Sequence, residues 1–236
     1  QKLLKFLHTR DTASQIRELT DKFQGNRELV ALEIGKIVSA ESYLYGGIEK
    51  CTACNGKGVI KNDWREDTCL KCDGKGFELS CSDLPHWSKT LEQFDKLDQF
   101  DNKDKIPLAI YHGVCAGLAV LTEGILVAPL EGVVSSRLID NNNGTTGVAI
   151  SFAGPIRSAG GTGQALSVLI ADIIRRKFKI SKSVITKNEV ERYKEEVSIY
   201  ARGLQYRPSN PQLETIARNC PIYIDGEGVG NEVTGQ

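Results

Sequence analysis

Apolar side chains recur at helical spacing in the first part of the chain. Between Ser14 and Ser39 they stand three or four positions apart, and Gly25-Asn26 interrupts the series. This pattern predicts two amphipathic helices separated by a break. A further helix is predicted over residues 107–128, where apolar residues again follow the helical period.

The second half of the chain mixes strand and helix patterns. Strands are predicted at Gly132–Ile139 and Gly147–Phe152, on either side of the turn-forming run Asp140–Gly144. A glycine-rich turn then opens a long helix from about Gly163 to Lys179. The remaining predicted elements are a charged helix at 187–203, a short helix after Pro208-Ser-Asn-Pro211, and a strand at Pro221–Ile224. Helices and short strands intermix without a strict repeat, which predicts an α+β fold.

Composition narrows the class of protein. The 236 residues carry 30 Lys+Arg against 30 Asp+Glu, so any contact with nucleic acid must come from a local patch. Hydrophobic content of 40% argues against disorder, and no apolar run is long enough to span a bilayer. The start lacks the features of a signal peptide, which predicts a soluble, cytoplasmic protein without a membrane partner. The absence of Met predicts an excerpt of a longer chain.

One eight-residue unit, Cys-x-x-Cys-x-Gly-x-Gly, occurs twice, at residues 51–58 and 69–76. Two residues between the cysteines let both thiolates reach one ion, and the glycines allow a tight turn beside it. Four sulfurs close a tetrahedron, so we predict a structural Zn²⁺ held by Cys51, Cys54, Cys69 and Cys72. Buried inert thiols, a redox dithiol and an iron–sulfur cluster are alternatives that the glycine-rich double repeat favours less.

The second candidate site is the glycine-rich turn before the long helix. Its small residues allow close backbone approach to a ligand, and a helix start offers unpaired N–H groups to phosphate. The candidate nucleic-acid-binding residues are Arg157, Ser158, Gly160, Gly161, Thr162 and Gly163, with Thr162 also a candidate helix cap. Gly160–Gly163 matches the G-x-x-G loop of KH modules, but neither a Walker A loop nor a dinucleotide fingerprint occurs. A turn that only packs the helix against a sheet is an equally weighted interpretation.

Other polar and cysteine residues fit structural roles. Arg175-Arg-Lys177 would stabilise a helix C-terminus, and the glutamates between 189 and 196 would form a solvated face. Those glutamates would bind a divalent ion only if Asp225 or Glu227 folded against them. Cys115 and Cys220 stand among apolar residues and are interpreted as core, and the three histidines are isolated. The sequence therefore predicts no catalytic residue in this chain.

A long run around the glycine turn resembles a known family. Residues 152–172, Phe-Ala-Gly-Pro-Ile-Arg-Ser-Ala-Gly-Gly-Thr-Gly-Gln-Ala-Leu-Ser-Val-Leu-Ile-Ala-Asp, resemble a signature of the large subunit of archaeal family-D DNA polymerases. Flanking segments agree in the same order, among them Leu121–Ile125, Leu204–Ser209 and Asn219–Gly226. The resemblance covers nearly the whole chain except the cysteine unit, which many members lack.

This resemblance implies a replicative, DNA-directed DNA polymerase whose large subunit works with a small nuclease subunit that supplies 3′–5′ exonuclease activity. The implied partners are that small subunit, the DNA template–primer and a sliding clamp, in a nucleoid-associated location. The family's polymerising centre, which uses two Mg²⁺ ions, lies far downstream of this region. The resemblance therefore implies that this chain scaffolds the subunit and contacts DNA.

We expect four regions. They are an N-terminal helical region at 1–50, an inserted four-cysteine zinc-knuckle module at 51–81, a polar linker at 82–106 that carries a short helix, and an α+β domain at 107–236. The competing hypothesis is a non-enzymatic zinc-ribbon protein-interaction module, because the cysteine unit also resembles the zinc centre of the DnaJ chaperones. That chaperone family uses four such units, however, and its J-domain motif is absent from this sequence.

Overall fold

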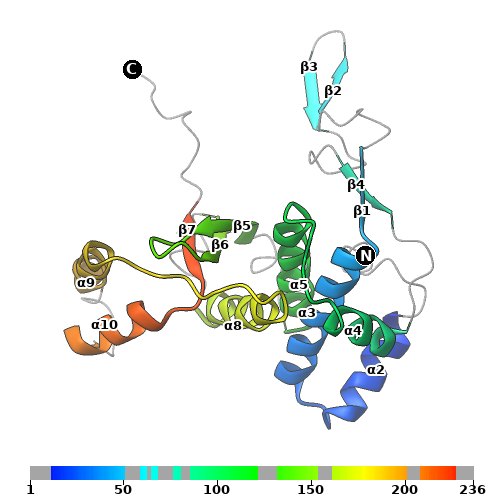
Figure 1. The fold of residues 1–236 in the computed structure, drawn as a ribbon, viewed down its shortest axis with the longest axis horizontal. Helices are drawn as coiled ribbons and strands as arrows, with labels where there is room; N and C mark the ends of the chain where they lie inside the picture. The colour runs from blue at the N-terminus through cyan, green and yellow to red at the C-terminus, as the bar shows by residue number, and fades with distance from the viewer. Residues whose placement is uncertain are drawn as a thin grey trace.

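The computed structural model describes residues 12–50, 59–62, 65–68, 77–80, 86–121, 132–153, 161–200 and 208–226. Within these ranges the helices are α2 (Thr12–Lys22), α3 (Arg27–Leu44), α4 (Trp87–Asp95), α5 (Lys105–Leu121), α8 (Gly161–Lys177), α9 (Lys187–Tyr200) and α10 (Asn210–Asn219). The strands are β1 (Gly47–Lys50), β2 (Val59–Asn62), β3 (Arg65–Thr68), β4 (Phe77–Ser80), β5 (Val133–Asp140), β6 (Thr146–Phe152) and β7 (Tyr223–Gly226) (Figure 1). The predicted α+β class is confirmed.

The break between the first two helices lies where the sequence predicts it. Gln24 and Gly25 both have positive φ, at 52° and 77°, a conformation that ends a helix. Asn26 then caps α3, because its side-chain oxygen accepts a hydrogen bond from the Leu29 N–H at 3.0 Å. Three consecutive residues therefore stop one helix and start the next.

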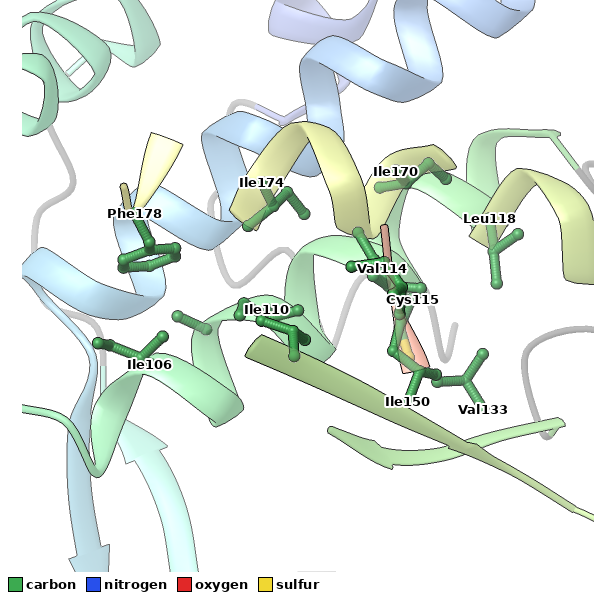
Figure 2. Packing of buried hydrophobic residues seen from close by; sticks show 14 of the residues in the cluster. Ile106, Ile110, Val114, Cys115, Leu118, Val133, Ile150, Ile170, Ile174 and Phe178 are labelled. Atoms are coloured by element: carbon green, nitrogen blue, oxygen red, sulfur yellow. The ribbon is translucent and has the colours of Figure 1, made fainter. Parts of the chain in front are cut away.

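Helices α3, α5 and α8 pack together, and α5 lies against the sheet β5-β6-β7 (Figures 1 and 2). The α3–α5 crossing is close because it is made by glycines. A Cβ on Gly113 would lie 2.5 Å from the Gly35 carbonyl oxygen, so the two backbones touch. Figure 2 shows Ile110 and Val114 of α5 in the buried cluster together with Ile174 of α8.

The sheet has strand order β5-β6-β7 and mixed direction. β5 and β6 form an antiparallel hairpin around the predicted turn, whereas β6 and β7 are parallel. Val148, Ile150 and Phe152 on the middle strand are all buried in the cluster that the helices share. The side-chain alternation of a strand places Ala149 and Ser151 on the opposite face.

Helix α4 lies inside the segment predicted as a polar linker, and it contributes to the core. Trp87, Thr90 and Phe94 are buried along its length. Phe94 belongs to a group of four aromatic rings in mutual contact, whose centroids lie 5.0–6.1 Å apart: Tyr43, Phe94, Phe100 and Phe178. Lys177 at the end of α8 also pairs with Asp95 at 2.7 Å. These contacts hold α4 and the following loop against α3 and α8.

Several element boundaries differ from the prediction. Helix α5 begins at Lys105, two residues before the predicted start, and residues 122–131 lie outside the described ranges. The last strand is shifted to Tyr223–Gly226, because the Pro221 carbonyl accepts from the Ser183 N–H outside the strand ladder. Within the described residues, no helix is long and apolar enough to cross a membrane.

Candidate functional site

The glycine-rich turn joins the end of β6 to the start of α8. Residues 154–160 lie outside the described part of the chain, and they include the candidates Arg157, Ser158 and Gly160. The remaining candidates, Gly161, Thr162 and Gly163, form the first turn of α8. The helix thus begins about two residues earlier than predicted. Thr162 lies within that first turn and not before it, so it does not occupy the predicted capping position.

Strand directions place this turn at a shared edge of the sheet. Phe152 at the end of β6 pairs with Gly226 at the end of β7, in parallel register. Val133 at the start of β5 pairs with the same Phe152 in antiparallel register. The chain therefore enters β5 and leaves both β6 and β7 at one edge. In open α/β sheets, the carboxyl ends of parallel strands are a recurrent position for ligand sites.

Sequence reasoning missed the second segment at this edge. The run Gly226-Glu-Gly-Val-Gly230 follows the last strand directly and has the same small-residue character as the first turn. Its composition was the available signal, but the parallel pairing of β6 with β7 was needed to show that the two segments leave the sheet from neighbouring strand ends. Residues after Gly226 lie outside the described ranges, so only their point of departure is defined.

An ion pair crosses the face of the sheet opposite the helices. Arg137 of β5 donates to the Asp225 carboxylate of β7, spanning the middle strand at its small residues Ala149 and Ser151. Asp225 is thereby paired with a cation, so it does not complete an acidic site with the glutamates of α9. Within the described residues, no group of three His, Cys, Asp or Glu side chains is placed to hold a metal ion. Glu227 lies outside them.

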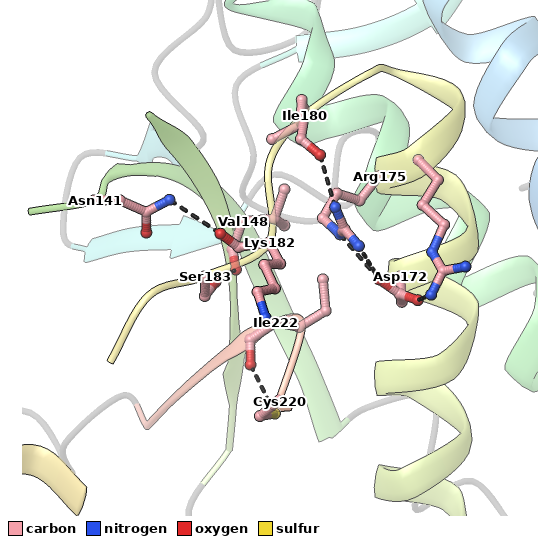
Figure 3. A network of polar contacts seen from close by, with 10 residues as sticks. Asn141, Val148, Asp172, Arg175, Ile180, Lys182, Ser183, Cys220 and Ile222 are labelled. Atoms are coloured by element: carbon pink, nitrogen blue, oxygen red, sulfur yellow. Dashed lines mark hydrogen bonds and ion pairs between the residues drawn. The ribbon is translucent and has the colours of Figure 1, made fainter. Parts of the chain in front are cut away.

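The basic run at the end of α8 has a structural role, as the sequence indicated. Arg175 is buried; its Nε lies 2.9 Å from the Asp172 carboxylate, and one of its Nη atoms donates to the Ile180 carbonyl at 2.7 Å (Figure 3). Arg176 pairs with the other Asp172 oxygen at 2.6 Å. These cations close the helix C-terminus, at the end of α8 away from the glycine turn.

The opposite edge of the sheet is tied by side chain–backbone hydrogen bonds. Asn141 donates to the Lys182 carbonyl and accepts from the Val184 N–H, each at 3.0 Å. Ser183 donates to the Val148 carbonyl at 3.1 Å (Figure 3). The connection after α8 is therefore fastened where β6 begins. The glycine-rich segments therefore follow the sheet at its other edge, where β6 and β7 end.

Histidines and cysteines of the described region have local partners. Ser42 Oγ and His112 Nδ1 lie 2.9 Å apart between α3 and α5, while His86 caps α4 and lies 3.2 Å from Glu18. Cys115 is buried in the core as predicted, whereas Cys220, which was also predicted to be core, is only half-buried. Burial raises the pKa of the Cys220 thiol, which favours its protonated form. None of these groups resembles a catalytic arrangement.

The zinc candidates Cys51, Cys54, Cys69 and Cys72 lie outside the described residues, but the strands around them are defined. β1 and β4 pair with Lys50 opposite Phe77, and β2 and β3 pair with Val59 opposite Thr68. The first cysteine segment therefore leads from the β1–β4 ladder to the β2–β3 ladder, from residue 50 to 59. The second leads back from residue 68 to 77. This backbone topology is compatible with two Cys-x-x-Cys pairs serving one ion.

Comparison with known proteins identifies a family. Residues 89–236 match the family described as "DNA polymerase II large subunit DP2, N-terminal". The matched segment begins after the cysteine unit and includes α5, the sheet and helices α8 to α10. It covers more than half of the chain.

Individual relatives agree with this match. The chain is 52% identical over 132 residues to the DNA polymerase II large subunit of Picrophilus torridus, and 51% identical over 132 residues to that of Thermoplasma acidophilum. It is 47% identical over 134 residues to that of Methanococcoides burtonii. These alignments cover 55–56% of this chain but only 11–12% of each relative. The chain therefore spans a small part of the relatives' length and belongs to the N-terminal family of the DNA polymerase II large subunit.

Proposed function

We propose that this chain forms an N-terminal, non-catalytic part of the large subunit of a heterodimeric archaeal replicative DNA polymerase, and that it contacts template–primer DNA. The observation that carries this proposal is the family match over residues 89–236, which contains the glycine-rich strand–turn–helix. Template-directed synthesis, with its two Mg²⁺ ions, belongs to other parts of the polypeptide. The role of this part is to organise the subunit and position DNA.

The proposed DNA contact lies at the edge where β6 and β7 end. Two glycine-rich segments join the sheet there, and α8 begins there with the unpaired N–H groups of its first turn. The sequence of that first turn, Gly161-Thr-Gly-Gln164, carries no carboxylate that would repel phosphate. Arg157 supplies the charge in this proposal, and the small residues allow backbone approach.

Arg157→Ala in the full heterodimer tests this contact. Removing one phosphate contact should weaken DNA binding, and should reduce the slope of log affinity against log salt by about 1. The matched control is Arg176→Ala, which removes a guanidinium from the opposite end of α8, where it pairs with Asp172. An equal effect of the two changes, or no effect of the first, would assign the glycine turn to packing alone.

We also propose that Cys51, Cys54, Cys69 and Cys72 bind one structural Zn²⁺ ion. Both cysteine segments connect the β1–β4 ladder to the β2–β3 ladder in sequence, and this topology supports the proposal. The purified protein should contain about one equivalent of zinc, and Cys54→Ser combined with Cys72→Ser should abolish it. Cys220→Ser, a change of a half-buried cysteine in another region, is the control and should leave the zinc content unchanged. Metal retained by the double variant, or iron in place of zinc, would contradict the proposal.

The remaining partners follow from the same subunit identity. We propose a small nuclease subunit as the principal partner, with 3′–5′ exonuclease activity in the complex, and a sliding clamp as a further contact. The alternative of a stand-alone zinc module is less favoured, because the family match lies outside the cysteine unit. Co-purification of the full-length large subunit with the small subunit, with and without residues 1–236, would test whether this part is needed for the heterodimer.

A further inference from the structure

Exposed apolar side chains are concentrated in the last part of the chain. Among the described residues, seven large hydrophobic side chains are exposed, and one of them, Leu29, lies on α3. The other six lie between α8 and β7: Leu169, Val184, Tyr193, Ile199, Ile216 and Ile224. Scattered exposed apolar residues are normal on a protein surface, but a concentration of them in one part of the chain is a feature of contact regions.

Three of these residues lie on the helix pair α9–α10, which is at one end of the molecule's longest axis (Figure 1): Tyr193 and Ile199 on α9, and Ile216 on α10. Val190 on α9 and Leu213 and Ala217 on α10 are buried, and these apolar residues define the seam of the pair. Ile199 on α9 is 65% exposed and Ile216 on α10 is 53% exposed, so neither belongs to this seam. The pair therefore exposes two β-branched aliphatic side chains that are not needed to bury its own helices against each other.

The charges of the pair are largely neutralised within it. Lys194 of α9 lies 2.8 Å from Glu191 and 3.0 Å from Glu214 of α10, and Arg218 pairs with Glu214 at 2.8 Å. Arg192 and Glu196 pair along α9 at 2.9 Å. Cations that are already matched by carboxylates attract phosphate weakly. Exposed isoleucines beside charges that are already paired favour a protein as the binding partner over DNA.

We propose that the α9–α10 pair is a docking element for the remaining, C-terminal part of the same large-subunit polypeptide. The aligned relatives are far longer, since the match occupies only 11–12% of their length and belongs to an N-terminal family. A surface on the same chain is present at a high effective concentration, so it reaches an exposed apolar face ahead of a separate molecule. The proposal rests on family membership and is independent of the DNA contact proposed at the glycine turn.

Site-specific photo-crosslinking in the full-length heterodimer identifies the occupant. A benzophenone-bearing phenylalanine analogue would replace Ile199 or Ile216, and Leu29 in a control protein. We expect irradiation to join positions 199 and 216 to residues beyond 236 of the same polypeptide, and position 29 to join none of these. Crosslinks to the small subunit, to a second copy or to DNA would overturn the proposal. So would a yield no higher than that of the Leu29 control.

Hydrogen exchange in the full-length heterodimer gives a second, independent readout. Ile216→Glu places a charge in the proposed contact, so we expect amides of α9 and α10 to exchange at least about tenfold faster than in the unaltered protein. Leu29→Glu, a matched change on α3, should leave those amides unchanged. Unchanged exchange in the Ile216→Glu protein would also overturn the proposal, even if DNA binding were normal.

Discussion

The α3–α5–α8 core and the α9–α10 pair are built from different contacts. In the core, glycine backbones touch and aromatic rings from α3, α4 and the end of α8 interlock. In the pair, a few apolar side chains are buried and a partly exposed ion pair joins two helices whose isoleucines remain uncovered. Regions with dense apolar contact open only with global unfolding, whereas sparsely packed regions open locally. The comparison predicts that the α3–α5–α8 core is rigid and that the α9–α10 pair opens locally more often.

The largest loss of stability is expected from Phe94→Ala. Phe94 is buried among Tyr43, Phe100 and Phe178, and its removal leaves a cavity that these rings cannot fill. Truncation of a buried phenylalanine costs about 3–5 kcal/mol of unfolding free energy. Tyr193→Ala on α9, where the ring is 40% exposed, should have a much smaller effect in urea titrations. Equal losses would mean that the core and the pair do not differ in packing.

Gly113→Ala should be the next most damaging change. The added Cβ would lie 2.5 Å from the Gly35 carbonyl oxygen and 2.6 Å from Ile174 Cδ1, so α3 and α5 would have to separate. Overpacking of this kind costs about 1–3 kcal/mol, which outweighs the better helix propensity of alanine. The control is Ala165→Val, which adds methyl groups at an exposed position of α8. A stabilised Gly113→Ala protein would contradict the close crossing.

A smaller, pH-dependent effect is expected at Glu41, on the last turn of α3. Burial raises the pKa of this carboxyl to about 7. Because this carboxyl ionises more easily in the unfolded chain than in the folded protein, the free energy of unfolding falls as pH rises from about 4.5 to 7. Glu41→Gln should therefore be neutral near pH 4.5 and stabilise by roughly 1–2 kcal/mol at pH 8, after allowance for partial exposure.

Glu92→Gln provides the opposite sign on α4. A hydrogen bond from Lys96 lowers the pKa of the exposed Glu92 carboxyl, so this group contributes stability above its ordinary pKa and loses it in acid. Removing its charge should slightly destabilise the protein at neutral pH. Thermal unfolding followed from pH 4 to 8 distinguishes the two variants, and curves of the same sign would exclude burial as the cause at Glu41.

The smallest effect on global stability is expected from Lys194→Ala. Its ammonium group links Glu191 and Glu214 of the α9–α10 pair, and both carboxylates are open to solvent, so each ion pair contributes little. We expect little change in melting temperature but faster hydrogen exchange confined to α9 and α10. Faster exchange across α3 and α5 as well would show that the two regions unfold as one unit.

Local signals in the sequence predicted much of the fold. The Gly25-Asn26 break, the hairpin turn at Asp140–Gly144 and the helical period of α8 each act within a few residues, and the structure contains all three. The parallel pairing of β7 with β6 was not predictable in this way. It joins residues far apart in the chain, and no turn chemistry specifies it.

The roles of site residues were also predictable where they depend on local sequence and not where they depend on long-range contacts. The structural roles of Arg175 and Cys115 followed from position and apolar context. The three histidines looked isolated in sequence, yet His112 meets Ser42 across two helices and His86 caps α4. The cap was readable from a polar residue immediately before a helix, whereas the Ser42 contact depends on the α3–α5 crossing. Metal binding and DNA contact remain predictions, because their central residues lie outside the described ranges.

The pairing of β1 with β4 has a consequence for how such a polypeptide changes over evolutionary time. Gly47 lies opposite Ser80, so the excursion that contains the cysteines departs from the helical body and returns to it at neighbouring points. An insertion whose two ends are neighbours can be gained, lost or exchanged as a unit, because a short loop can then connect α3 to α4 in its place. Descendants of one ancestral subunit can thus differ in this accessory while keeping the same packed body.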